Sequence, residues 1–226
     1  MCGFFEFNNN SPLADELIEA LDIDEQTPMF RANMGAGPAS SVDIIVQSGS
    51  DRIVVPAVWW LLLDPQTLKP SRYTSFNTRS DKLNVKNSAG FIPYRHNRCI
   101  IPATAVIEGE GAKGSRRYHS IKPQHCAFAM GGLYRQWINK VTGEQATSCS
   151  VITLPPHPKW QTIHSQSTPL FLPHADKAII QQWLDPDVTN VEVFNQLLTP
   201  SFHDQLIATP IDRPSTRNPT GSTFQL

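Results

Sequence analysis

The second residue of the chain has the most reactive chemistry in this sequence. Cys2 lies between Met1 and Gly3, and methionine aminopeptidase removes Met1 when the next side chain is small. Cys2 would then carry an α-amine and a thiol on adjacent carbons, with ordinary pKa values of about 8 and about 8.5, so each has a nucleophilic fraction at neutral pH. An aldehyde condenses with such an amine to an imine, and the thiolate then closes a thiazolidine ring. The start of the chain could therefore capture an aldehyde, although many cytosolic proteins begin with Met-Cys without such chemistry, so the motif gains meaning only together with others.

The cysteines as a set do not indicate a metal site or a disulfide. No two of Cys2, Cys99, Cys126 and Cys149 have CxxC spacing, and no Cys/His cluster has the spacing of zinc ligands. The first residues lack a basic segment followed by an apolar run, so no secretory signal is visible and reduced thiols in the cytoplasm are expected. Neither GxGxxG nor a P-loop occurs, so we expect no organic cofactor and no metal.

The composition is that of an ordinary globular protein. The chain has 226 residues, of which 40% are hydrophobic and 17% charged. Its formal net charge of −1 does not attract a polyanion, so any surface for nucleic acid must be a local cluster of Lys and Arg. No segment approaches the roughly 18 consecutive apolar residues that span a bilayer, so no membrane partner is expected.

Three segments have helical patterns. Ser11 can accept a hydrogen bond as an N-cap, Pro12 suits the first helical position, and apolar residues recur at helical spacing as far as Leu21. The sequence therefore predicts a helix over Ser11–Leu21. Two shorter helices are predicted over Lys177–Leu184 and Val191–Leu198.

Strands are predicted where apolar and β-branched residues form short runs. These runs are Val42–Val46, Arg52–Trp60, Arg98–Ile107, His125–Leu133 and Thr147–Leu154. We expect a Gly-rich basic loop over Gly109–Arg117 and an extended surface tail from Thr209 onward. The polar span from Pro65 to Ala89 lacks periodicity, and such spans tend to carry function. Scattered strands with few helices predict a single α+β domain over residues 1–226, with a β-rich, antiparallel or barrel-like core and peripheral helices.

An ordered series of motifs resembles the SOS-response-associated peptidase (SRAP) family over nearly the whole chain. The matching segments are Met1–Gly3, Trp59–Trp60, Phe76–Asp81, Arg98–Ala103, Glu108, Gly131–Trp137, Val151–Thr153, Ile163–His164 with Pro169–Leu170, and Trp183–Leu184. Each match is modest, but their shared order is specific. The resemblance implies recognition of abasic sites in single-stranded DNA and a covalent thiazolidine crosslink through Cys2.

The resemblance also implies catalytic roles, and each suits its residue type. Cys2 would be the nucleophile, and Asn77 would hold the abasic sugar or the Cys2 amine with an amide that both donates and accepts hydrogen bonds. Glu108 would move protons in the amine and imine steps, with a pKa raised by partial burial at the end of an apolar run. His164 would polarise the sugar ring oxygen, because histidine titrates near working pH.

Three further residues are implied to bind DNA. Arg79 would contact a backbone phosphate. Trp59 and Trp60 would stack against unpaired bases, at roughly 1–3 kcal/mol per base. The competing interpretation is a solvated surface position for Arg79 and burial in the core for the tryptophans.

The chain departs from the family pattern at two positions that usually hold arginine. Phe4 follows Met-Cys-Gly, and the segment Ser165–Thr168 has no arginine and is one residue longer. Because each lost phosphate contact weakens binding, we expect a divergent member that binds DNA weakly, prefers another DNA geometry or has lost the activity. A compensating basic patch could come from Lys82, Lys86, Lys113, Arg116 and Arg117, although solvated surface is the preferred interpretation for them.

Two other classes of function stay open. Met-Cys-Gly also begins glutamine amidotransferases with an N-terminal cysteine nucleophile, so an amidohydrolase, or the peptidase of the family's name, is one alternative. The other is a module that binds single-stranded DNA without covalent chemistry. Glutaminase activity would favour the first, and retention on abasic DNA that survives loss of Cys2 would favour the second.

Overall fold

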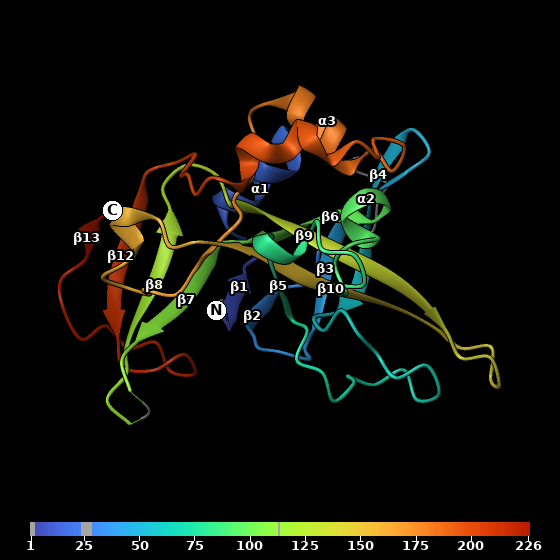
Figure 1. Ribbon diagram of the computed structural model, residues 1–226. Helices are drawn as coiled ribbons and strands as arrows, with labels where there is room; N and C mark the ends of the chain where they lie inside the picture. The colour runs from blue at the N-terminus through green and yellow to red at the C-terminus, as the bar shows by residue number, and fades with distance from the viewer. Residues whose placement is uncertain (1–2, 24–28, 113) are drawn as a thin grey trace.

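The computed structural model describes residues 3–23, 29–112 and 114–226. Cys2 of the predicted site and Lys113 of the predicted basic patch lie outside these residues. Two β-sheets form the body of the described chain, and short helices cover one of them (Figure 1). The predicted α+β class, with a barrel-like core and peripheral helices, is confirmed.

One sheet closes on itself as a barrel. Its strands are β3 (Ser41–Ser48), β4 (Asp51–Val58), β6 (Arg98–Ala103), β9 (Phe128–Ile138) and β10 (Gln145–Leu154). β10 pairs with β9 on one side and touches β4 on the other at a single residue pair, Ser148 and Val58, which completes the ring. Two short strands also pair with the end of β10: β5 (Asn77–Arg79) runs parallel to it and β11 (Thr168–Pro169) antiparallel.

The other sheet has the strand order β13-β12-β8-β7-β1-β2. Its strands are β1 (Phe4–Phe7), β2 (Asn33–Ala36), β7 (Ala105–Glu110), β8 (Arg117–Pro123), β12 (Leu206–Ile211) and β13 (Phe224–Gln225). β1 runs antiparallel to β7, with Phe5 opposite Val106 and Phe4 opposite Ile107. This sheet therefore brings the beginning of the described chain beside β7.

The helices cover one face of the barrel sheet. They are α1 (Pro12–Ala20), α2 (Pro93–His96) and α3 (Lys177–Leu184), with the 3-10 helix η3 (Val191–Leu198). Figure 1 shows α1 and α3 on the same side of β6 and β9. As predicted, the helix α1 begins after Ser11, whose hydroxyl accepts the backbone N–H of Leu13.

The core has two parts because β6 is buried on both faces. Cys99, Ile101 and Ala103 pack between the two sheets, whereas Ile100 packs towards the helices with Leu17 of α1. Alternate residues of a strand point to opposite faces. This burial explains why β6 is a continuous apolar run in the sequence rather than an alternating one.

The predicted strand Arg98–Ile107 is wrong as a single element. It divides at Thr104 into β6 and β7, which belong to different sheets. The backbone N–H of Thr104 donates to the carbonyl oxygen of Glu6 at 2.8 Å, and its hydroxyl donates to the same oxygen at 3.3 Å. These bonds to β1 turn the chain from the barrel into the second sheet.

Three other segments also differ from the prediction, in their boundaries or in the type of helix. The expected basic loop is shorter, because β7 continues to Glu110 and β8 begins at Arg117. The segment Val191–Leu198 is a 3-10 helix. The expected surface tail from Thr209 begins inside β12, which pairs along its whole length with β8.

The tail also holds β1 through a buried charge. Glu6 is 5% exposed, and its carboxylate forms ion pairs with Lys122 of β8, at 3.6 Å, and with Arg217 of the tail. The Asp212 carboxylate fixes the turn that presents Arg217 by accepting the backbone N–H of Asn218 at 2.9 Å. Segments from both ends of the chain therefore meet at Glu6.

Arg98 anchors two helices to the start of β6. Its guanidinium is buried and donates to the carbonyl oxygens of Tyr94 and Trp183 at 2.7 Å each, and to those of Arg95 and Asp185. These oxygens lie at the C-terminal ends of α2 and α3, where the helix dipole favours a cation. Burial lowers the pKa of Arg98 to about 10, so the side chain is still charged at neutral pH.

We expect Arg98→Lys to lower the free energy of unfolding by about 2–4 kcal/mol, because one ammonium group cannot satisfy carbonyls of both helices and leaves buried acceptors unpaired. Urea unfolding followed by tryptophan fluorescence measures this change. Arg72→Lys, at an exposed position, is the matched control and should change stability by less than about 0.5 kcal/mol. Equal unfolding midpoints for the two variants would show that Arg98 is not an anchor.

Candidate functional site

Glu108 and His164 come together from distant parts of the chain. Glu108 lies near the end of β7 and is 3% exposed, and His164 is 8% exposed. The Nδ1 atom of His164 is 4.0 Å from Oε2 of Glu108. The sequence resemblance had given roles to both residues, and the fold brings these two into one buried pair.

A short 3-10 helix fixes the position of His164. This helix, η2 (Pro158–Trp160), ends in the fully buried Trp160. The backbone N–H of His164 donates to the carbonyl oxygen of Trp160 at 2.9 Å, and the preceding residue, Ile163, is also fully buried. The imidazole is thus attached to the core immediately before it.

The surroundings of His164 favour one tautomer of the neutral ring. Its Nδ1 lies 3.2 Å from the carbonyl oxygen of Gly109, which can only accept, so Nδ1 carries the hydrogen and the lone pair is on Nε2. Burial lowers the pKa of His164 below its usual value. The neutral ring, with Nε2 able to accept a proton, is therefore the main form at neutral pH.

Glu110 is a further member of this group that the sequence interpretation did not select. Its Oε2 atom accepts the backbone N–H of Ser165 at 2.7 Å and lies 3.8 Å from Nδ1 of His164. The bond from Ser165 lowers the pKa of Glu110. Residues two apart on a strand share a face of the sheet, so the spacing from Glu108 was the signal that could have identified it.

Trp59 cannot stack on a base, because it is fully buried. Its indole N–H donates to the carbonyl oxygen of Phe76 at 2.7 Å. Its ring centroid lies 4.7 Å from that of Phe5 on β1 and 5.8 Å from that of Phe76. The DNA-binding role expected for Trp59 is thus corrected: the side chain joins β1 to the residue before β5. Trp60 is half-buried beside Phe76.

β5 carries the two remaining predicted residues. Asn77 begins β5 opposite Val151 of β10 and is half-buried. Arg79 ends β5, with 70% of its side chain exposed, and donates two hydrogen bonds of 2.9 Å to Asp81. Exposed ion pairs contribute little to stability, so a phosphate can compete with Asp81 for this guanidinium.

An open groove of about 450 Å³ lies beside Arg79. One wall comes from Arg79 and Asp81, another from the end of β10 at Thr153, and a third from Gln166, two residues after His164. The groove therefore joins the exposed guanidinium to the segment that carries the imidazole. Lys82, Lys86, Arg116 and Arg117, the described members of the predicted basic patch, are all exposed.

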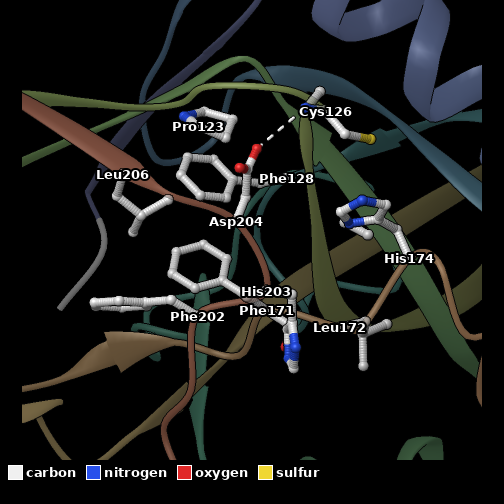
Figure 2. A pocket seen from close by; sticks show the side chains of 12 residues that line it. Pro123, Cys126, Phe128, Phe171, Leu172, His174, Phe202, His203, Asp204 and Leu206 are labelled. Atoms are coloured by element: carbon white, nitrogen blue, oxygen red, sulfur yellow. Dashed lines mark hydrogen bonds between the residues drawn. The ribbon is translucent and has the colours of Figure 1, made fainter. Parts of the chain in front are cut away.

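A second group of polar and aromatic residues, around Asp204, is structural (Figure 2). The Asp204 carboxylate accepts the backbone N–H groups of His125 and Cys126 at 2.7 and 3.2 Å, and thereby holds the chain before β9. The cavity between these residues has a volume of about 10 Å³, room for one water molecule at most. It has no space for a substrate.

The described thiols are not nucleophiles at neutral pH. Burial raises the pKa of Cys126 to about 12 and raises that of Cys99 and Cys149 as well. Since the thiolate is the reactive form, these three cysteines are inert. Within residues 3–23, 29–112 and 114–226, no cluster of three or more His, Cys, Asp or Glu could hold a metal ion, and no helix could span a membrane.

Solved structures of bacterial proteins share this fold. A protein from Bacteroides thetaiotaomicron matches with a TM-score of 0.69 at 20% identity, covering 93% of this chain and 92% of its own. A protein from Bordetella bronchiseptica matches with a TM-score of 0.70 at 18% identity, covering 94% of this chain and 100% of its own. A phage-related protein from the same organism matches with a TM-score of 0.68 at 14% identity, covering 94% and 95%. The search of curated proteins found no match.

The family model described as SOS response associated peptidase (SRAP) matches residues 1–214. This range includes β1, β5, β7 and the segment of His164, and so covers every predicted site residue from Cys2 to His164. Because the match spans nearly all of the chain, the protein belongs to the SRAP family.

Proposed function

We propose that this protein recognises abasic sites in single-stranded DNA and forms a thiazolidine crosslink through Cys2 after loss of Met1. The observation that carries the proposal is the buried pair of Glu108 and His164 beside the first strand. Along β1, the step from Phe5 to Phe4 corresponds to the step from Val106 to Ile107 on β7. The N-terminal end of β1 therefore runs towards Glu108, the next residue of β7.

The proposed reaction needs only the amine and thiol of Cys2 and a side chain that moves protons. The Cys2 amine loses a proton and attacks the aldehyde carbon of the opened abasic sugar, and the resulting hydroxyl leaves as water to give an imine. The Cys2 thiolate then adds to the imine carbon, and the nitrogen takes up a proton. The sum is aldehyde plus aminothiol giving thiazolidine and water. Glu108 accepts and returns the protons at nitrogen.

His164 and Asn77 are assigned to the sugar. An abasic sugar is mostly a closed hemiacetal, so its hydroxyl must lose a proton and its ring oxygen must gain one before the aldehyde appears. The imidazole of His164 can perform such transfers, since its lone pair is on Nε2. Asn77 would hold the sugar by its amide. Phe76, the residue before it, and Phe5 both contact Trp59, which supports a place for Asn77 near the start of β1.

The groove beside Arg79 is the proposed path of the DNA strand. Its wall has a single exposed guanidinium and the polar side chains of Ser80 and Gln166. Trp60, half-buried beside Phe76, stays the candidate for stacking against a base. With one arginine and a net charge of −1, the protein would bind intact DNA weakly, and the covalent bond would provide most of the retention on a lesion.

We expect purified protein without Met1 to gain the mass of an oligonucleotide bearing one abasic site, less one water, after incubation. Intact-mass analysis measures this product. Cys2→Ala should abolish the adduct that survives denaturation, because without the thiol the remaining amine forms only a hydrolysable imine, whereas Cys126→Ala, which removes a buried thiol, should leave it unchanged. Retention on abasic DNA under denaturing conditions that survives Cys2→Ala would disprove the Cys2 linkage.

We expect Glu108→Gln to slow crosslink formation by roughly 10²-fold or more, since the amide cannot accept the proton of the amine, with a similar dissociation constant for intact DNA. Single-turnover gel assays give the rate, and fluorescence anisotropy gives the affinity. Glu144→Gln, an exposed residue in the turn between β9 and β10, is the matched control. A Glu108→Gln variant that reacts at the rate of this control would remove Glu108 from the mechanism.

We expect Arg79→Gln to weaken binding of single-stranded DNA and to reduce the slope of log K against log salt concentration by roughly 0.7, the contribution of one phosphate contact on a single strand. Binding titrations at several salt concentrations test this. Arg72→Gln, exposed in the loop before β5, removes the same charge outside the groove and should leave the slope unchanged. Identical slopes for the two variants would place the DNA elsewhere.

A further inference from the structure

We propose that Glu110 is a positioning residue of the site, which holds His164 in place through the backbone of Ser165 and stabilises the protonated imidazole. Two contacts of one carboxylate oxygen support this. The same Oε2 atom that accepts the Ser165 N–H at 2.7 Å lies 3.8 Å from Nδ1 of His164. One side chain of β7 thus binds the peptide that follows His164 and faces its ring.

The first contact attaches the chain to β7 immediately after His164. Before His164, the chain is attached to the core by the buried Trp160 and Ile163. After it, Ser165 and Gln166 are exposed, and the bond from Ser165 N–H to Glu110 fastens the chain at the imidazole. This bond uses a backbone donor, so it depends on the side chain at position 110 more than on the one at position 165.

The second contact is electrostatic. The hydrogen on Nδ1 is directed to the Gly109 carbonyl oxygen, at 3.2 Å, while Oε2 of Glu110, at 3.8 Å, is beyond hydrogen-bond distance and acts as a charge. Glu110 is one-third exposed, and its bond from Ser165 lowers its pKa, so it is ionised at neutral pH. Its charge therefore favours the imidazolium.

Other charges act on the same ring. Burial is the main cause that lowers the pKa of His164, and the guanidinium of Arg116 lowers it further, whereas Glu110 raises it. Glu108 on the same face of β7 is the other acidic side chain that faces the ring among the described residues. Removing the charge of Glu110 should therefore move the pKa of His164 downward.

The test distinguishes the hydrogen bond from Ser165 to Glu110 from the effect of the Glu110 charge on His164. Glu110→Gln keeps an oxygen that can accept the Ser165 N–H but removes the negative charge, and Glu110→Ala removes both. The pKa of His164 is read from its imidazole signal in an NMR pH titration, with the signal assigned by its loss in His164→Gln. Glu144→Gln, an exposed carboxylate in the turn between β9 and β10, is the matched control.

We expect the His164 pKa to fall in Glu110→Gln and to stay unchanged in Glu144→Gln. In Glu110→Ala, we also expect the Ser165 amide to exchange faster with solvent. An unchanged His164 titration in Glu110→Gln would overturn the inference, and that variant carries the test if Glu110→Ala does not fold.

The effect on reaction rate rests on the proposed function. If crosslinking occurs, Glu110→Gln should slow it near neutral pH and shift the pH–rate profile towards lower pH with the His164 pKa, and Glu110→Ala should be slower still. A wild-type protein that forms no adduct, while Glu110→Gln still lowers the His164 pKa, would refute the crosslinking function and leave this assignment of Glu110 intact. Adduct formation by the wild-type protein, together with an unaltered His164 titration in Glu110→Gln, would refute the assignment of Glu110 and leave the crosslinking function intact.

Discussion

The buried guanidinium of Arg98 is the contact on which the arrangement of the other elements depends. Removing a cation from water is costly unless its hydrogen bonds are replaced, and here carbonyl oxygens from α2 and α3 replace them. Both helices are thereby held at the start of β6. Since β6 separates the two parts of the core and leads into β7, a charge at the start of β6 helps to determine where Glu108 lies.

Ends of strands supply most of the candidate site. Glu108 and Glu110 lie near the end of β7, Asn77 begins β5, and the described part of the chain enters β1 at Phe4. Strand ends are rigidly placed by their sheet but are not covered by it, so they suit residues that must meet a ligand. Trp59 joins two of these ends by packing between Phe5 and Phe76. The side chain expected to touch DNA instead packs between the first described strand and the residue before β5.

The sequence pattern was sufficient to predict those elements that depend on neighbouring residues alone, such as a capped helix or a short apolar strand. The N-cap at Ser11 and the apolar runs of β3, β4 and β10 identified their elements to within a few residues. The division at Thr104 could not be predicted, because it depends on hydrogen bonds to Glu6, 98 residues away. Trp59 and Trp60 are adjacent residues of one type, and only the tertiary packing distinguishes the buried ring from the half-buried one. The order of the motifs was enough to predict the family. The role of Glu110 could not be predicted in the same way, because it depends on the contact with Ser165, which only the fold creates.

The ion pair between Glu6 and Arg217 has a consequence for where this domain can be cut. The family match ends at residue 214, between β12 and Arg217, so a fragment excised at that boundary would lose the guanidinium while keeping the buried carboxylate. Removing one partner of a buried ion pair is strongly destabilising, and Lys122, 3.6 Å from Glu6, would be the remaining described counter-charge. The destabilised strand would be β1, at the opposite end of the chain from the deletion. We therefore expect stable folding to require residues beyond 214, because the turn that carries Arg217 stabilises β1 through Glu6.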